Sequence, residues 1–143
     1  AAMISKVFQL NDLTAKDLMT PRVAAPTLQG RVSLQSVKSI LLENNSTWWV
    51  VLGEEVDKIV GVANREKLLT SLLRGDSNLT PYELSETVEF VPEMIRVDRL
   101  LLGFNDDKKG VRVVVDEFGG FVGLVGAEAV LAVLAGWWGK SKT

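Results

Sequence analysis

Two stretches of the chain show the same alternation of short apolar runs and polar turns. The runs are Trp48–Leu52 and Lys58–Ala63 in the first stretch, and Val111–Val115 and Phe121–Val125 in the second. All four are rich in β-branched residues, and the residues between the runs of each pair are polar or glycine. Short β-branched runs bounded by turn residues are typical of β-hairpins. The pattern therefore predicts two hairpins.

A helix is predicted on each side of both hairpins. Ser33 and Asn64 are suitable N-caps for the first two helices, and Gly75 is a suitable C-cap. Apolar residues recur at helical spacing in the segments Leu34–Asn44, Arg65–Arg74, Val97–Phe104 and Ala127–Ala135. Gly61 and Gly123 occupy the same place in the two hairpins. The unit helix, strand, strand, helix thus occurs twice, which indicates an internal repeat.

A short extended segment ending near a proline precedes each unit: Leu18–Arg22 in the first and Glu89–Glu93 in the second. Proline disfavours the α region for the residue before it, so both segments are predicted to be leading strands. A small sheet with helices on one face leaves its other face uncovered. We therefore predict an α+β fold of two pseudo-twofold-related β-α-β-β-α units packed sheet to sheet, with a crevice at the pseudo-twofold axis.

The repeat also gives predicted domain boundaries. Residues 1–75 are the first repeat with its lead-in, 76–84 a polar linker, 85–136 the second repeat, and 137–143 a C-terminal tail. Trp137 and Trp138 in the tail have two open interpretations: an interface patch, or docking onto the chain's own domain.

Composition removes most catalytic chemistry. The 143 residues include no cysteine and no histidine, which excludes disulfides, thiol nucleophiles, structural zinc of the usual kind and Ser-His-Asp triads. The net charge of −2 does not favour a nucleic-acid partner. No apolar run is long enough to span a bilayer, and the first residues do not form a signal peptide. We predict no catalytic residue, no metal site and no enzyme activity.

Three motifs resemble the CBS-domain pair, or Bateman module, of the CorC/HlyC-type and cyclin-M-like family. They are Met19–Arg22, Phe90–Glu93, and Val114–Gly120 leading to Gly123–Val125. The family is associated with magnesium or cobalt transport and with haemolysins. The resemblance implies a regulatory module at the cytosolic face of the inner membrane, attached to a membrane transport domain and forming a homodimer through its helices. It implies no required cofactor, with AMP, ADP or ATP (with magnesium) as regulatory ligand.

The resemblance also implies a nucleotide site in the crevice. Its candidate residues are Thr20, Arg22, Trp49, Val50, Asn64, Lys67, Val91, Pro92, Arg112, Val113, Gly126 and Ala129. In the family pattern a Ser or Thr and, three residues later, an Asp hold the ribose. Here these positions are Asn64 and Lys67 in the first repeat, and Gly126 and Ala129 in the second. Each lost charge-assisted hydrogen bond costs about 1.5–3 kcal/mol, or roughly one to two orders of magnitude in affinity.

Two functions therefore stay open. Either at least one site binds an adenine nucleotide, or the module is degenerate and only mediates dimerisation. Several side chains likewise have two interpretations. Asn64 is a ligand contact or a helix cap, and Lys67 meets a phosphate or points to solvent. One of Trp48 and Trp49 stacks on adenine, or the pair serves the core and a subunit contact. Asp116–Glu117 is a carboxylate pair or a turn.

Overall fold

The structure is a computed structural model that describes residues 12–55, 58–76, 78–106 and 109–141, the last five of these as backbone only. The chain divides into two compact units. The continuous unit is Val23–Val88, and the discontinuous unit joins the residues up to Arg22 to the residues from Glu89 onward. A short 3₁₀ helix, Arg22–Ala24, lies where the chain passes from one to the other.

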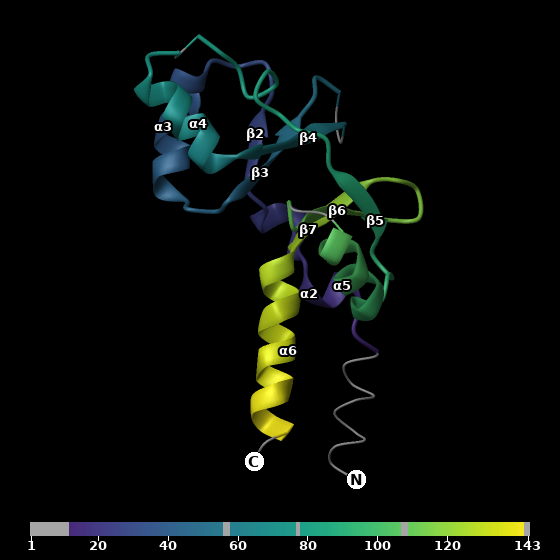
Figure 1. Cartoon of the computed structure of the whole chain (residues 1–143). Helices are drawn as coiled ribbons and strands as arrows, with labels where there is room; N and C mark the ends of the chain where they lie inside the picture. The colour runs from purple at the N-terminus through teal and green to yellow at the C-terminus, as the bar shows by residue number, and fades with distance from the viewer. Residues whose placement is uncertain (1–11, 56–57, 77, 107–108, 142–143) are drawn as a thin grey trace. The chain divides into compact units, whose positions relative to one another are not determined.

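The continuous unit holds the first repeat (Figure 1). Its elements are β2 Thr27–Gln29, α3 Leu34–Glu43, β3 Trp48–Leu52, β4 Ile59–Asn64 and α4 Arg65–Leu73. The sheet order is β2-β3-β4, with β2 parallel to β3 and β3 antiparallel to β4. Both helices pack on one face of this sheet in a single core. The buried members of this core include Leu34, Val37, Leu41, Trp49, Val51, Ala63 and Leu68.

The discontinuous unit holds the second repeat. Its elements are α2 Ala15–Leu18, β1 Thr20–Pro21, β5 Glu89–Pro92, α5 Val97–Asp106, β6 Val111–Val115, β7 Phe121–Gly126 and α6 Ala127–Ser141. The sheet order is β1-β7-β6-β5. A second core forms between this sheet and its helices, with Val91, Val114, Leu100 and Val130 among its buried residues.

The register of the two sheets confirms the internal repeat. Each sheet contains a parallel pair followed by an antiparallel hairpin, and the hairpin is irregular at the same step, after Val51 in one and after Val114 in the other. Gly61 lies opposite Val51, and Gly123 lies opposite Val114. The predicted α+β class and the repeated hairpin between two helices are therefore confirmed.

The caps follow the sequence as well. The Ser33 side chain accepts a hydrogen bond from the Ser36 backbone at the start of α3. Gly75 follows α4 with a φ of 87°, and its N–H donates to the carbonyl of Leu72. The left-handed backbone here is the conformation in which glycine is least strained. Both helix ends therefore lie where the sequence predicted them.

The leading strand of the first repeat is a correction. The prediction placed it at Leu18–Arg22, but the strand parallel to β3 is β2, Thr27–Gln29. Thr20 and Pro21 do form a strand, β1, which pairs with β7 of the second repeat. The apolar signal of β2 is weak because Leu28 is its only buried residue. In the second repeat, β5 lies at the predicted place.

The C-terminal helix is longer than predicted. It was expected to end at Ala135 before a tail, yet α6 continues as helix through Gly136 to Ser141. An added Cβ on Gly136 would meet nothing within 4 Å, so this glycine interrupts no packing. The side chains of Trp137 and Trp138 lie outside the described residues, and both interpretations of that pair stay predictions.

Candidate functional site

The junction of β4 and α4 carries the first two predicted ribose positions. The Asn64 side-chain oxygen accepts hydrogen bonds from the backbone N–H groups of Glu66, at 2.9 Å, and Lys67, at 3.3 Å. Asn64 is therefore the N-cap of α4, as one of its two interpretations held. The first-turn N–H groups that an anion would bind are partly satisfied by this cap.

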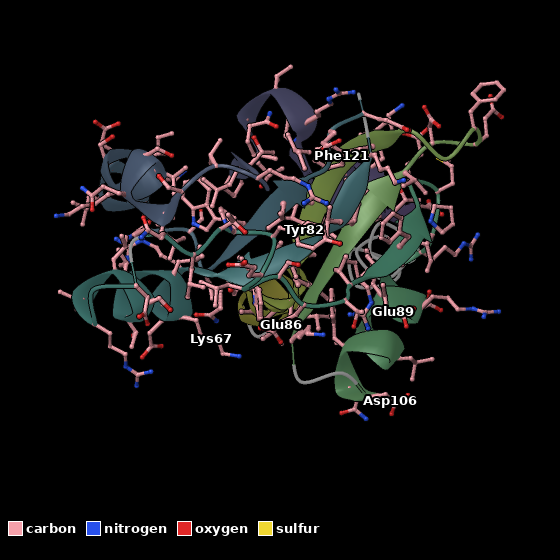
Figure 2. All side chains as sticks on the ribbon, turned by 90° about the horizontal axis from the view of Figure 1, so that it is seen from above. Lys67, Tyr82, Glu86, Glu89, Asp106 and Phe121 are labelled. Carbon is pink, nitrogen blue, oxygen red and sulfur yellow. The ribbon has the colours of Figure 1, made fainter. Side chains whose placement is uncertain are left out.

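Lys67 is a solvent-exposed residue of α4, as one of its two interpretations held, and it also forms an ion pair. Its ammonium lies 3.2 Å from the Glu86 carboxylate, with the lysine side chain 64% exposed (Figure 2). Glu86 is in turn fixed by its backbone, which exchanges hydrogen bonds of 2.7 and 3.0 Å with Val62 on β4. At this junction the polar groups of the first repeat thus bind one another.

The junction of β7 and α6 has a different character. Ala127 N–H donates to the carbonyl of Gly110 at 2.8 Å, which mirrors the 2.8 Å bond from Arg65 to Thr47 in the first repeat. The cap position is Gly126, which has no side chain to offer the helix, and the position three residues later is the half-buried Ala129. The backbone geometry is repeated, whereas the side-chain cap of the first repeat is not.

Trp49 and Arg112 occupy equivalent strand positions and both face the helices of their own unit. Trp49 is 1% exposed within the core, and its indole N–H donates to the carbonyl of Ser46 at 2.9 Å. Arg112 is 5% exposed; it donates to the carbonyl of Val111 at 2.9 Å and lies 4.8 Å from the centre of the Phe104 ring. Both side chains are buried in their own unit, whereas Trp48 is half-buried.

The remaining predicted strand residues lie on both faces of the sheets. Val50 and Val113 are fully buried but belong to neither helix-covered core, because neighbouring strand residues point to opposite faces. Val91 lies in the core of the discontinuous unit. Thr20 and Pro92 are exposed.

Arg22 is also exposed, and its guanidinium lies 5.9 Å from the centre of the Phe121 ring. In the structure Thr20 pairs with Leu124 on β7, and Leu124 lies two residues before Gly126 at the end of that strand. The crevice expected between the repeats stays a prediction, and so does the grouping of these residues around it.

The acidic pair at the second hairpin forms a turn. One Asp116 carboxylate oxygen accepts hydrogen bonds from the N–H groups of Phe118, at 2.9 Å, and Gly120, at 2.8 Å. Gly119 has a φ of 82°, as such a turn requires. Within the described part of the chain, no group of three or more acidic residues is placed to hold a metal ion.

Comparison with solved structures gives the family. The chain matches the CBS domain of a bacterial CNNM/CorC-family Mg²⁺ transporter, solved in complex with ATP, at 32% identity and a TM-score of 0.83. The match covers 94% of this chain and 95% of that one. The chain is a CBS-domain pair of the CNNM/CorC family.

Curated relatives of this CBS-domain pair are longer than the chain. A UPF0053 protein of Synechocystis is 40% identical over 134 residues, which is 94% of the chain and 39% of the relative. A magnesium and cobalt efflux protein CorC of Vibrio cholerae is 31% identical over 137 residues, or 94% of the chain and 46% of the relative. The chain thus spans less than half the length of these relatives. No family model matches it.

The relatives agree with the predicted class of protein, a transporter component rather than an enzyme. Among the residues that the structure describes, no helix combines the length and hydropathy of a membrane span.

An apolar groove also lies on the second repeat of this CBS-domain pair. It has a volume of about 510 Å³ and runs between α5 and the start of α6, lined by Leu101, Leu102, Phe104, Asn105, Ala127 and Leu131. Leu102 is 66% exposed and Leu131 57% exposed. In the continuous unit, a separate polar hollow of about 410 Å³ contains Arg31, whose guanidinium lies 4.6 Å from the centre of the Tyr82 ring and 3.1 Å from Glu54.

Sequence reasoning missed two interactions of this CBS-domain pair, the ion pair of Glu86 and the core packing of Met19. Glu86 follows the predicted linker, and nothing local indicates that it pairs with Lys67 nineteen positions earlier. Met19 was noticed as part of a motif, yet its packing on the core of the second repeat is a long-range contact. The one available signal is indirect. Gly61 on β4 and Gly123 on β7, here named the outer strands of the two hairpins, indicate that another segment approaches each strand closely.

Proposed function

We propose that this CBS-domain pair is a regulatory module that binds an adenine nucleotide at the junction of β7 and α6. The observation that carries the proposal is the ATP complex of a 32% identical family member with the same fold over 94% of the chain. AMP and ADP are further candidate ligands, and magnesium would accompany the phosphates. The ligand is regulatory and no cofactor is required.

The chemistry of the two junctions favours the second repeat as the binding site. At α4 the first turn is capped by Asn64, and Lys67 is paired with Glu86. At α6 the cap residue is Gly126, which leaves room and backbone N–H groups for a phosphate at the positive end of a long helix. Backbone groups and apolar contacts would then provide most of the affinity.

Binding would act through a shift in conformational populations. A ligand that prefers one arrangement of the module changes the state of whatever is attached to it. We propose that the attached part is a membrane transport domain that carries magnesium or cobalt, with the module at the cytosolic face of the inner membrane. The names of the relatives and the greater length of their chains support this.

Restoring the family's ribose contacts should strengthen binding. We expect Gly126→Thr combined with Ala129→Asp to raise the affinity for ATP about tenfold to a hundredfold, because a hydroxyl and a carboxylate would reach the ribose. The site tolerates a side chain, since an added Cβ on Gly126 would lie 3.7 Å from the Gly110 oxygen, an ordinary contact. Isothermal titration calorimetry with ATP, ADP and AMP, with and without magnesium, measures the change.

The matched control is Gly126→Val combined with Ala129→Asn, which has the same shape without the hydroxyl or the charge. It should bind no better than the original chain. If neither the original chain nor the Thr/Asp variant releases heat at millimolar nucleotide, the site is closed. The module then has the other function considered, dimerisation without a nucleotide.

We further propose that the module forms a homodimer through its helices. Exposed leucines on α5 and α6 support this, together with the apolar groove between these helices. Burying a leucine contributes about 1.5–3 kcal/mol, so Leu102→Ser with Leu131→Ser should raise the dimer dissociation constant at least tenfold.

Sedimentation equilibrium tests the dimer against the chain mass of 15.7 kDa. Val23→Ser is the matched control, since Val23 is 98% exposed and lies outside these helices. A chain that stays monomeric at high concentration would rule out the dimer. A dimer equally weakened by the Val23 variant would exclude the groove as its interface.

A further inference from the structure

The segment Leu13–Pro21, here named the strap, is built into the second repeat although it precedes the first. The N–H groups of Ala15 and Lys16 donate to the carbonyls of Ile95 and Glu93, both at 2.9 Å. In return the Val97 N–H donates to the carbonyl of Leu13 at 3.1 Å. These bonds attach the strap to the turn that opens α5.

The strap also contributes to the core of the second repeat. Ala15 is fully buried there, and Leu13, Leu18 and Met19 pack against the same cluster. The strap then continues as β1 along the edge of β7, with Thr20 opposite Leu124 and Pro21 opposite Gly123. It therefore contacts both the hydrophobic core and the outer strand of the sheet.

Strand β7 is shaped for this contact. A Cβ added to Gly123 would lie 2.7 Å from the carbonyl oxygen of Thr20, closer than real Cβ atoms come. The first repeat has an equivalent arrangement on its own outer strand, where Gly61 makes room for the backbone of Glu86. Each outer strand is thus covered by the segment that precedes the other repeat in the sequence.

We propose that the strap positions the nucleotide site at the β7–α6 junction and responds to its occupancy, with Met19 and Thr20 as its positioning residues. The inference rests on the proposed function. Strand β7 carries the strap at Gly123 and Leu124 and ends two residues later at Gly126, where α6 begins without a loop. A ligand that holds the start of α6 therefore also fixes the strand on which the strap lies.

The consequence is a reciprocal coupling between strap and ligand. If docking of the strap orders β7 and thereby strengthens nucleotide binding, the nucleotide strengthens docking by the same factor. The strap is thus a route by which the ligand state passes to any polypeptide that precedes Leu13. No such coupling is expected at the outer strand of the first repeat, because Asn64 already caps α4 there.

The first experiment is amide hydrogen exchange on the 143-residue chain with and without ATP and magnesium. The reporters are the N–H groups of Ala15, Lys16 and Val97, which hold the strap. Those of Val62 and Glu86 are the internal reference, because they form the equivalent edge of the first repeat. We expect saturating ATP to slow the strap reporters about tenfold more than the reference pair, which separates a local effect from general stabilisation.

The second experiment measures ATP affinity in variants of the strap. Met19→Ala should weaken ATP binding about tenfold, and Met19→Leu should restore it because leucine keeps most of the apolar contact. Leu84→Ala is the matched control: Leu84 packs on the core of the first repeat, so its loss should leave ATP affinity unchanged. The exchange result does not depend on any variant folding.

The outcomes separate the two proposals. Suppose that ATP binds and protects the first turn of α6, while the strap reporters follow the reference pair and Met19→Ala keeps its affinity. The strap inference is then wrong, and the proposed function stands. If the original chain gives neither heat nor protection with ATP, both proposals are overturned together.

Discussion

Replacing Trp49 by alanine is expected to lower the free energy of unfolding by about 3–5 kcal/mol. Trp49 is 1% exposed and is the largest of the fully buried side chains among the described residues. Its ring lies in the core of the continuous unit with leucines from β2, α3 and α4, and its N–H is bonded to Ser46. The alanine variant would leave a large cavity and an unpaired carbonyl. For a domain with a total stability of about 5–15 kcal/mol, this is a major loss.

Denaturant unfolding followed by far-ultraviolet circular dichroism measures this effect without relying on fluorescence, to which the three other tryptophans contribute. Trp48→Ala is the matched control, since Trp48 is only half-buried and its loss should cost much less. The alternative interpretation of Trp49, stacking on an adenine, makes the opposite prediction. If the alanine variant kept its stability and lost only nucleotide binding, the structural role described here would be wrong.

The repeat and its hairpins could be predicted because their signals are local. Each hairpin is a pair of β-branched runs with a turn between them, and Asp116 and Gly119 satisfy that turn within five residues. Caps are local as well, so Ser33, Asn64 and Gly75 lie where the sequence put them. Interactions over three or four residues are what a single sequence records most directly.

The pairing of the leading strands could not be predicted in the same way. Nothing within Leu18–Arg22 states which sheet its backbone joins, since a two-residue strand has no pattern of its own. The true leading strand β2 is three residues long and buries only Leu28. Edge pairing depends on contacts more than 100 residues apart, such as Thr20 with Leu124. The only sequence signal of this pairing is Gly123 on β7, the strand with which β1 pairs.

The places of the four candidate ribose positions in the fold could be predicted, but the partners of their side chains could not. The family pattern put residues 64, 67, 126 and 129 where a strand passes into a helix, and the structure has these strand-to-helix junctions there. The Lys67–Glu86 pair depends on where the segment after the first repeat returns to β4, which no local pattern encodes. Arg112 was named as a candidate site residue without a partner, and its contact with Phe104 of α5 depends on how the helix packs on the sheet.

The outer strands provide the second large expected effect. Gly61→Ala should lower the free energy of unfolding by about 1–3 kcal/mol, with Gly123→Ala in the same range. An added Cβ on Gly61 would overlap the carbonyl oxygen of Glu86, which accepts the hydrogen bond from Val62. A backbone carbonyl cannot rotate out of the way as a flexible side chain can. The segment that carries Glu86 must therefore move away from β4, and the hydrogen bond from the Val62 N–H to the Glu86 carbonyl must break.

Gly136→Ala is the matched control for both variants. Gly136 lies inside α6 with nothing within 4 Å of an added Cβ, so alanine should keep stability or raise it by about 0.5–1 kcal/mol through its better helix propensity.

Denaturant unfolding gives the three free energies, and hydrogen exchange shows where each edge opens. Gly61→Ala should expose the amides of Val62 and Glu86, whereas Gly123→Ala should expose those of Ala15 and Lys16. A methyl group cannot be added to a closely covered strand without displacing the segment that covers it. If Gly61→Ala lowered the free energy of unfolding no more than Gly136→Ala, the close packing of the Glu86 segment on β4 would be wrong.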